Sequence, residues 1–237
     1  MILSRLGLVE LRMIARIEAQ VRLRAVIEVT GASSTKRGLY ERLAYRWRFA
    51  SALPTVMAER SRIRDRSLRD DGPPLLRALD TDLLVVCAAP ILSPAMVRVP
   101  TIAAVNLHYG VVPDYRGMHG IFWALVNRDY ERVGVTLHHL AKKVDRGAVL
   151  AKGYPALRSR DTEASILARC ADLGAELVVH YVDAVAAGAR PSGIPQMDTG
   201  RTYRDAERDL RAQARFALAE RFGARIPSTD RRVERFY

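Results

Sequence analysis

The chain has 237 residues, 49% of them hydrophobic, and a net charge of +12. This length suits one globular domain with or without an appendage. A membrane span needs about 18 consecutive apolar residues, and no run of that kind occurs. Charged residues interrupt the opening MILSRLGLVELRMIAR, unlike a secretory signal. Cys87 and Cys170 are the two cysteines, so we expect a cytoplasmic protein with reduced thiols.

The positive charge comes almost wholly from arginine, because only four of the 38 basic residues are lysine. An arginine excess can reflect genomic base composition as readily as phosphate binding. A basic surface attracts anionic partners, but on its own it identifies none of them.

The first 80 residues indicate one strand and two helices. Residues 9–20 have apolar positions at helical spacing, and residues 22–31 are typical of a strand. Residues 33–53 are predicted to form a basic amphipathic helix with aromatic side chains. Those side chains suit a partner or membrane surface, but packing against the domain is the preferred interpretation. Residues 54–74, which contain the sequence DGPP, are predicted to be a loop with no more than a short helix.

Strands and helices alternate from residue 81 onward. The run TDLLVVCAA is apolar throughout, as in a strand that is buried on both faces. Further strands are expected at residues 102–108, 133–140 and 149–157, with helices at 93–97, 117–128 and 161–187. This alternation predicts an α/β fold: a Rossmann-like, open, mostly parallel sheet flanked by helices.

The tail differs in composition from the rest of the chain. It begins with Gly193, Pro195 and Gly200, and a charged helix is expected from Tyr203 to Arg221. We therefore predict a main domain over residues 1–190 and a charged helical C-terminal extension, solvated and with little core of its own, over residues 191–237.

Asn106 and His108 are the first candidates for chemistry. Side chains two apart on a strand point to the same face, and ligands of open parallel sheets bind beyond the carboxyl ends of the strands. An amide and an imidazole placed together can stabilise a developing oxyanion. Asp145 follows the next strand and is the candidate carboxylate partner of His108. The pair alone is a weak motif, since most isolated histidines are structural; His138 and His139 are examples.

The ordered run from Asn106 to Gly147 is much more specific. Its elements are Asn106-x-His108, Val111-Val112-Pro113, Tyr115-Arg116-Gly117, Trp123-Ala124, Gly134-Val135-Thr136 and Asp145-Arg146-Gly147. In this order they resemble the catalytic core of the 10-formyltetrahydrofolate-dependent formyltransferases. That family includes the glycinamide ribonucleotide, methionyl-tRNA and sugar N-formyltransferases. The resemblance covers about residues 75–187.

The resemblance implies that the chain transfers a formyl group from 10-formyltetrahydrofolate to a primary amine. It implies Asn106, His108 and Asp145 as the catalytic residues, with the first two stabilising the oxyanion and Asp145 keeping His108 charged and helping to remove the amine proton. The folate would lie against Ile91, Leu92, Val97, Leu140, Ala141 and Val144, although Ile91 and Leu92 could equally be core residues. The substrate would contact Tyr109, Gly110, Tyr115 and Arg116. No metal is implied.

The chain also departs from the family pattern. Lys142 and Lys143 stand where the family is often acidic, and Gly120 replaces a common proline. The first strand and its glycine-rich turn are not evident before residue 9. Either the true start lies upstream, or MILSRLGLV is a degenerate edge.

Exclusion favours a small acceptor over a large one. The missing glycine-rich turn disfavours glycinamide ribonucleotide, and the tail is too short for the C-terminal barrel domain of the methionyl-tRNA enzymes. A nucleotide-linked amino sugar is therefore expected, with Arg116 attracting its diphosphate. The methionyl-tRNA and glycinamide ribonucleotide activities remain alternatives, as do a nucleic-acid-binding protein and an inactive scaffold homologue. The expected partners are the amine and folate, and a homodimer is left open.

Overall fold

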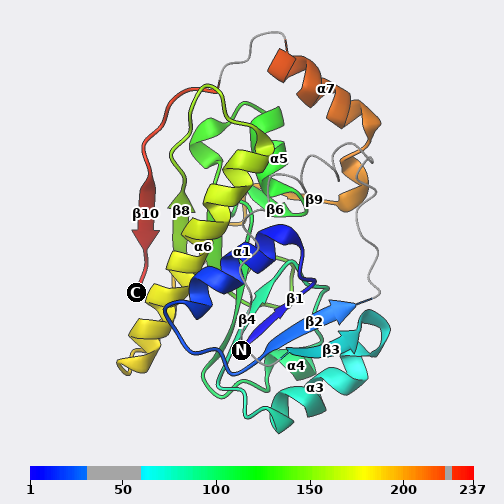
Figure 1. The fold of residues 1–237 in the computed structure, drawn as a ribbon, viewed down its shortest axis with the longest axis vertical. Coiled ribbons are helices and arrows are strands. Elements are labelled where there is room, and N and C mark those ends of the chain that lie inside the picture. Colours follow the sequence, from blue (N-terminus) through cyan, green and yellow to red (C-terminus); the bar gives the residue numbers. More distant parts are fainter. Residues whose placement is uncertain (31–59, 222–225) are drawn as a thin grey trace. The chain divides into compact units, whose positions relative to one another are not determined.

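The computed structural model describes residues 1–30, 60–221 and 226–237 (Figure 1). The helix expected at residues 33–53 lies outside these described residues. The chain divides into two compact units: residues 1–107 with 178–190, and residues 108–177 with 191–237. Within the described ranges, no helix is long and apolar enough to span a membrane.

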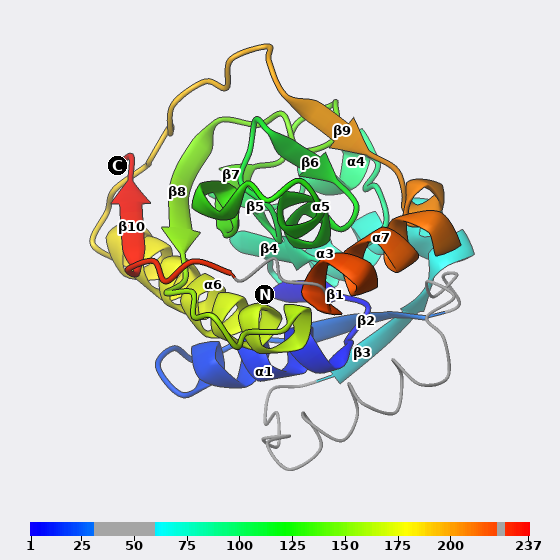
Figure 2. The same ribbon diagram turned by 90° about the horizontal axis from the view of Figure 1, so that it is seen from above.

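The first unit is built on five parallel strands in the order β5-β4-β1-β2-β3, all of which are labelled in Figure 2. Its strands are β1 (Ile2–Ser4), β2 (Val26–Thr30), β3 (Arg60–Arg64), β4 (Leu83–Cys87) and β5 (Ala103–His108), the last residue of which belongs to the second unit. Helices α1 (Leu8–Glu18), α3 (Leu68–Ala78) and α4 (Pro94–Val97) connect strands, and the 3-10 turn η1 (Asp65–Ser67) precedes α3. The predicted open, mostly parallel sheet flanked by helices is confirmed.

The first strand is present, and it is not an edge. Residues Ile2 to Ser4 form β1, which pairs in parallel with β2 on one side and β4 on the other. All three of its residues are buried. The interpretation of MILSRLGLV as a degenerate edge is therefore wrong. Three residues suffice because neighbours on both sides provide the backbone hydrogen bonds.

Residues 54–74 were expected to form a loop containing a short helix; of the described part, the helix is present and the loop is wrong. That stretch contains β3 and most of α3, although Pro73 and Pro74 lie inside the helix. A proline inside a helix lacks the backbone N–H donor and destabilises the helix by about 3 kcal/mol. Burial of Leu68, Pro73 and Leu76 offsets this cost, so tertiary packing overrides the local signal.

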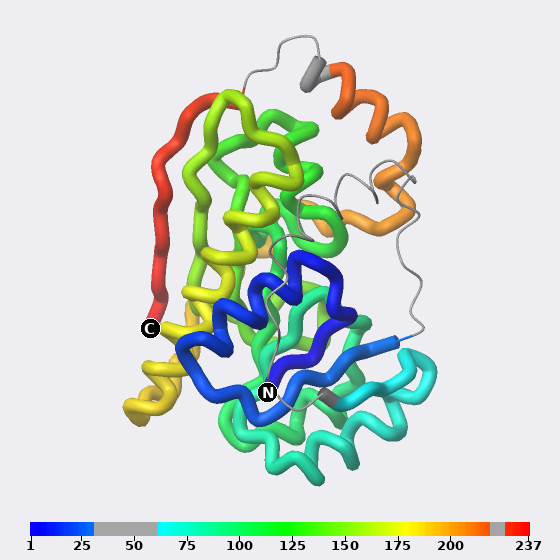
Figure 3. The backbone as a smooth tube through the Cα atoms, viewed as in Figure 1, coloured from blue at the N-terminus to red at the C-terminus, as the bar shows by residue number. Residues whose placement is uncertain are grey.

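The second unit has two small groups of strands. β10 (Arg232–Arg235), β8 (Val149–Tyr154) and β7 (Val135–His139) pair antiparallel, and Figures 2 and 3 show β10 running beside β8. β6 (Tyr115–Gly117) and β9 (Arg201–Tyr203) pair in parallel. The remaining elements are α5 (Gly120–Val126), η2 (Tyr130–Arg132), η3 (Asp205–Glu207), α7 (Leu210–Arg221) and α6 (Glu163–Ala186), the last of which continues into the first unit at residue 178.

The tail contributes more than a helix. Its helix begins at Leu210 rather than Tyr203, and β9 and β10 were not expected from the sequence. Tyr203 is buried, and its ring stacks on Trp123 at 5.0 Å and on Tyr115 at 5.8 Å between ring centroids. The tail segment is thus packed against the motif residues of the same unit, whereas the boundary predicted at residue 190 stays a prediction.

Candidate active site

His108 ends β5, and its imidazole is buried with 7% exposure. Its Nε2 lies 2.7 Å from the carbonyl oxygen of Tyr115. Gly110 leaves room for this contact, because a Cβ there would lie 2.6 Å from the His108 Nε2 and 2.4 Å from the Tyr115 oxygen. The glycine is therefore needed next to the imidazole.

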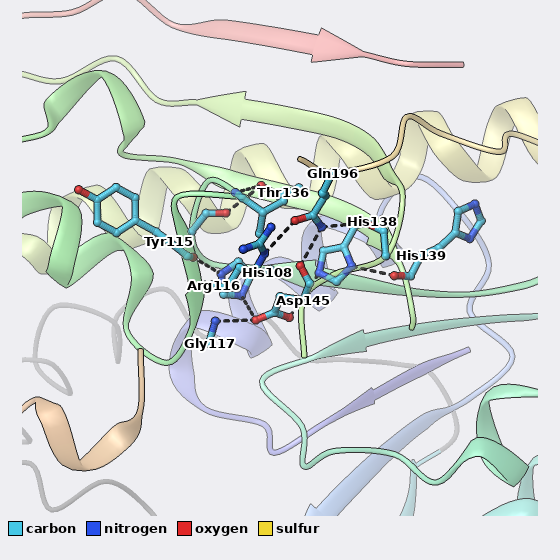
Figure 4. Close-up of polar contacts among 12 residues, drawn as sticks. His108, Tyr115, Arg116, Gly117, Thr136, His138, His139, Asp145 and Gln196 are labelled. Atoms are coloured by element: carbon cyan, nitrogen blue, oxygen red, sulfur yellow. Dashed lines mark hydrogen bonds and ion pairs between the residues drawn. The ribbon is translucent and has the colours of Figure 1, made fainter. Parts of the chain in front are cut away.

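Asp145 faces His108 from the turn that follows β7. One carboxylate oxygen, Oδ2, lies 3.4 Å from His108 Nδ1 and accepts a 2.7 Å hydrogen bond from the Gly117 N–H. The other, Oδ1, lies 3.4 Å from His138 Nε2. Figure 4 shows the carboxylate among these three groups. The predicted pairing of His108 with Asp145 is present.

The turn that presents Asp145 is conformationally demanding. Asp145 has a φ of +50°, in the left-handed region that costs most non-glycine residues about 1–3 kcal/mol. Gly147 cannot be replaced without movement, because a Cβ there would lie 1.7 Å from the His139 carbonyl oxygen. The surrounding contacts therefore have to hold this turn in place.

The charge on Asp145 is strongly stabilised. Burial acts to raise the pKa of its carboxyl group, but the imidazoles of His108 and His138 and the Gly117 N–H outweigh burial. Together they hold the pKa of Asp145 well below its ordinary value of 3.8. The group is therefore a carboxylate at neutral pH.

The contacts of His108 involve both nitrogens of its ring. A carbonyl oxygen faces Nε2 and a carboxylate faces Nδ1, and both are acceptors. Each of the two ring nitrogens of His108 therefore faces an oxygen acceptor. His138 is similar, with the His139 carbonyl oxygen at 2.8 Å from Nδ1 and Asp145 facing Nε2.

Sequence reasoning missed His138 as a partner of Asp145. It was treated as a structural histidine, yet only 2% of it is exposed and it contacts the second carboxylate oxygen. The available signal was a histidine two residues after Thr136 on an expected strand, although the strand pairing shifts register between Leu137 and His138. Thr136 in turn donates to the Gly110 carbonyl at 2.8 Å and accepts from the Val112 N–H at 3.2 Å, which fixes the loop after His108.

Two expected substrate contacts have protein partners instead. Arg116 is fully buried, and its guanidinium donates to the Gln196 side chain and to the carbonyl oxygens of Met197 and Thr199. Tyr115 is 4% exposed, its hydroxyl donates to Asp129, and burial raises its pKa to about 12. This geometry does not support a diphosphate contact for Arg116, and Gln196 was not foreseen.

The other predicted site residues are distributed over both units. Asn106 is half-buried on β5 in the first unit, and Tyr109 is half-buried in the second. Among the expected folate contacts, Ile91 is 80% exposed, so its interpretation as a core residue is wrong. Leu92, Val97 and Leu140 are half-buried, and Ala141 and Val144 are exposed. Their roles stay predictions.

A sequence model of the family described as formyl transferase matches residues 22–182. The chain belongs to the formyl transferase family. Formyl transferases of this family use 10-formyltetrahydrofolate, as the motif resemblance implied.

Curated relatives of this formyl transferase include a methionyl-tRNA formyltransferase from Methylacidiphilum infernorum. It is 39% identical over 129 residues, which cover 54% of this chain and 40% of the relative. The match therefore spans well under half the length of that relative.

Solved structures share the fold at low sequence identity. A sugar N-formyltransferase from Shewanella gives a TM-score of 0.63 at 14% identity, covering 91% of this chain and 85% of that one. A formyltransferase from Anoxybacillus kamchatkensis, in complex with a UDP-linked formamido sugar and tetrahydrofolate, gives 0.54 at 17% identity, covering 78% and 87%. At these identities the likeness concerns the fold alone.

Proposed function

We propose that the chain transfers a formyl group from 10-formyltetrahydrofolate to a primary amine. The observation that carries this proposal is the buried Asp145 carboxylate, held 2.7 Å from the Gly117 N–H and 3.4 Å from His108 Nδ1. Family membership and the ordered motif support the same reaction.

The folate would supply a formyl group on a nitrogen leaving group. As the amine nitrogen attacks, negative charge develops on the formyl oxygen. Asn106 and His108, two residues apart on β5, are proposed to donate hydrogen bonds to that oxygen, each contributing about 3 kcal/mol. The Nε2 hydrogen of His108 points at the Tyr115 carbonyl in this structure. Donation to a substrate therefore requires this hydrogen bond to be exchanged, and apo contacts often rearrange in this way.

Asp145 is proposed to act mainly by pairing with the charged His108. A carboxylate whose pKa is held well below its usual range is a weak base at neutral pH. The same low pKa keeps Asp145 negatively charged, and this negative charge stabilises the proposed imidazolium form of His108. The amine proton is therefore assigned to water rather than to Asp145. As the tetrahedral adduct collapses, the bond between the formyl carbon and the folate nitrogen breaks, and that nitrogen takes up a proton from water.

The folate would contact the segment just before Asp145. Leu140 is half-buried, and Ala141 and Val144 are exposed in an irregular stretch between β7 and the Asp145 turn. An apolar surface next to backbone donors and acceptors suits a flat heteroaromatic ring. In the first unit, Ile91 and Leu92 lie in the segment between β4 and α4, and Val97 is the last residue of α4.

The acceptor best supported is the amino group of methionyl-tRNA. The curated relative cited above is a methionyl-tRNA formyltransferase at 39% identity, whereas the sugar N-formyltransferase structure cited above is 14% identical. A nucleotide-linked amino sugar, expected from exclusion, is the second acceptor to test. The methionyl-tRNA acceptor was disfavoured because the tail of this chain is too short for a barrel domain, but the length of this tail does not establish which domains the whole protein has.

The test is a parallel amine assay. Purified chain is supplied with 10-formyltetrahydrofolate and, in separate reactions, methionyl-tRNA, a UDP-linked 4-amino sugar and glycinamide ribonucleotide. Mass spectrometry of the acceptor and release of tetrahydrofolate are both followed. We expect formylated methionyl-tRNA, and its loss in the His108→Ala variant. A product only in the sugar reaction would overturn the choice of acceptor but not the reaction.

The rival classes predict other outcomes. A scaffold homologue would formylate none of the amines. If the enzyme used another mechanism, the His108→Ala variant would formylate the amine as fast as the parent chain. A nucleic-acid-binding protein would retain tRNA at low salt whether or not methionine is attached, without any formylated product. Any of these results would overturn the proposal.

A further inference from the structure

The tail segment Gln196–Thr199 contacts the Asp145 turn at several points. The Gln196 Nε2 donates to the carbonyl oxygens of Asp145 at 2.7 Å and Gly147 at 2.8 Å. Asp198 forms an ion pair with Arg146, the residue between them. All three residues of the Asp145-Arg146-Gly147 motif are thus bound from one segment that lies about fifty positions later in the chain.

Arg116 fixes the orientation of Gln196. Its Nε donates to the Gln196 Oε1 at 3.0 Å, which leaves the amide nitrogen to face the turn. The same guanidinium donates to the carbonyl oxygens of Thr199 at 2.7 Å and Met197 at 3.0 Å. Every polar atom of the Gln196 amide therefore has a partner of the correct kind, and the buried arginine is the residue that selects this arrangement.

Two neighbouring residues of β6, Arg116 and Gly117, both act on Asp145. Arg116 acts on the backbone of the turn through Gln196, and its neighbour Gly117 binds the carboxylate directly through its N–H. Figure 4 shows Arg116, Gln196, Gly117 and Asp145 together. The tail is also joined to β6 by its own strand β9, with Arg116 opposite Thr202 and Gly117 opposite Tyr203.

We infer that Gln196 is a positioning residue for Asp145 and that Arg116 holds it in place. This inference rests on the proposed function, because it assigns the residues a role through a catalytic carboxylate. An aspartate in the left-handed region stays there only when its surroundings over-determine it. Two hydrogen bonds to the carbonyls of residues 145 and 147 meet that need, and they set the direction in which the carboxylate leaves the backbone.

The decisive experiment is a double-mutant cycle of Gln196→Met and Asp145→Asn. Gln196→Met keeps the length of the side chain and removes both donated hydrogen bonds. We expect kcat to fall about 10- to 100-fold, as for a misplaced catalytic group, with KM for the amine little changed. In the Asp145→Asn background the same substitution is expected to change kcat by less than about twofold, because the residue through which it acts is already lost.

A matched control separates positioning from general loss of structure. Gln213 is another half-buried glutamine of the same unit, and its Nε2 donates to the Arg208 carbonyl oxygen at 3.4 Å. Gln213→Met is expected to keep kcat within about twofold. An equal loss of kcat in Gln196→Met and Gln213→Met would overturn the inference. So would a fall in kcat on Gln196→Met that is as large in the Asp145→Asn background as in the parent chain.

A readout without turnover keeps this test independent of the proposed function. The titration of the Asp145 carboxyl carbon is followed by NMR in the parent chain, in Gln196→Met and in Arg116→Lys. Lysine keeps the charge but lacks the fork that holds the Gln196 oxygen and two carbonyls together. We expect the Asp145 midpoint to rise in both variants and to stay unchanged in Gln213→Met. An unmoved midpoint would overturn the positioning role even if the chain formylates no amine, and a parent chain without activity would count against the function alone.

Discussion

Two of the histidine–carboxylate contacts in the described part of the second unit differ in their surroundings. His108 and Asp145 are 3.4 Å apart, with side chains 7% and 10% exposed. His119 and Asp205 are closer, at 2.9 Å, but the Asp205 side chain is 54% exposed. Distance alone would rank the second pair as the stronger one.

The partners of the ring nitrogens reverse that ranking. His108 faces two acceptors, a carbonyl oxygen at Nε2 and a carboxylate oxygen at Nδ1. His119 faces Asp205 at Nε2 but the Arg208 guanidinium, a donor, at Nδ1, 3.5 Å away. One hydrogen satisfies His119, which is the neutral ring. In agreement, burial lowers the pKa of His119 despite the hydrogen bond to Asp205. A close carboxylate makes a charged imidazole only when the rest of the site supports the charge.

The largest expected difference between the pairs is in catalysis. Asp145→Asn keeps the size of the side chain but removes the charge beside His108, and we expect kcat/KM to fall about 10²- to 10⁴-fold. Asp205→Asn, the matched change beside His119, is expected to alter kcat/KM by less than about threefold. Steady-state rates of amine formylation measure both. Equal losses in the two variants would refute the distinction.

The turn that carries the buried carboxylate gives the next largest effect. Gly147→Ala places a Cβ 1.7 Å from the His139 carbonyl oxygen, so the backbone must shift, at a cost of about 1–3 kcal/mol in the free energy of unfolding. Gly188 has a φ of +91° but no heavy atom within 4 Å of a Cβ. Gly188→Ala should therefore cost only the conformational term, about 1–2 kcal/mol. Urea unfolding compares the free energies of unfolding of the two variants, and formylation rates compare their activities. Equal activity in Gly147→Ala and Gly188→Ala would contradict the role given to the turn.

Acid should weaken the buried pair in a defined direction. The pKa of Asp145 is lower in the folded chain than its ordinary 3.8, so its contribution to stability is present above 3.8. It is lost as pH falls from there towards the folded pKa. The parent chain is expected to exceed Asp145→Asn in unfolding free energy at pH 6, and the gap should narrow below about pH 4. Urea titrations at several pH values test this, and a gap that widens in acid would show the sign to be wrong.

The smallest effect concerns the pair of His119 and Asp205. Because the pKa of His119 lies below its ordinary 6.5 in the folded chain, the unfolded chain takes up the proton first. Stability should therefore decline as pH falls through 6.5. His119→Asn removes this contribution, so the variant should lose less stability than the parent between pH 7.5 and 5.5. Parallel thermal melts at these two pH values measure it, and identical slopes would contradict the assignment of a neutral ring.

The sequence was most informative where the signal is local. The apolar run of β4, the strand that ends at His108 and the helix α6 were all predicted, because burial imposes a pattern on neighbouring residues. The motif order led to His108 and Asp145. The predictions failed at β1, α3 and β10, which depend on neighbours far along the chain: β1 on flanking strands, α3 on buried side chains, and β10 on an edge of β8.

The sequence by itself determined the family, the fold class and the pair His108 and Asp145, since each follows from residues within a few positions of one another or from their order. Only the tertiary structure decided what holds the pair. The Gly117 N–H lies 28 residues from Asp145, and Gln196 lies 51 residues away. Hydrogen bonds over such separations depend on how β6, β9 and the Asp145 turn are placed, and no periodicity in the sequence records that placement.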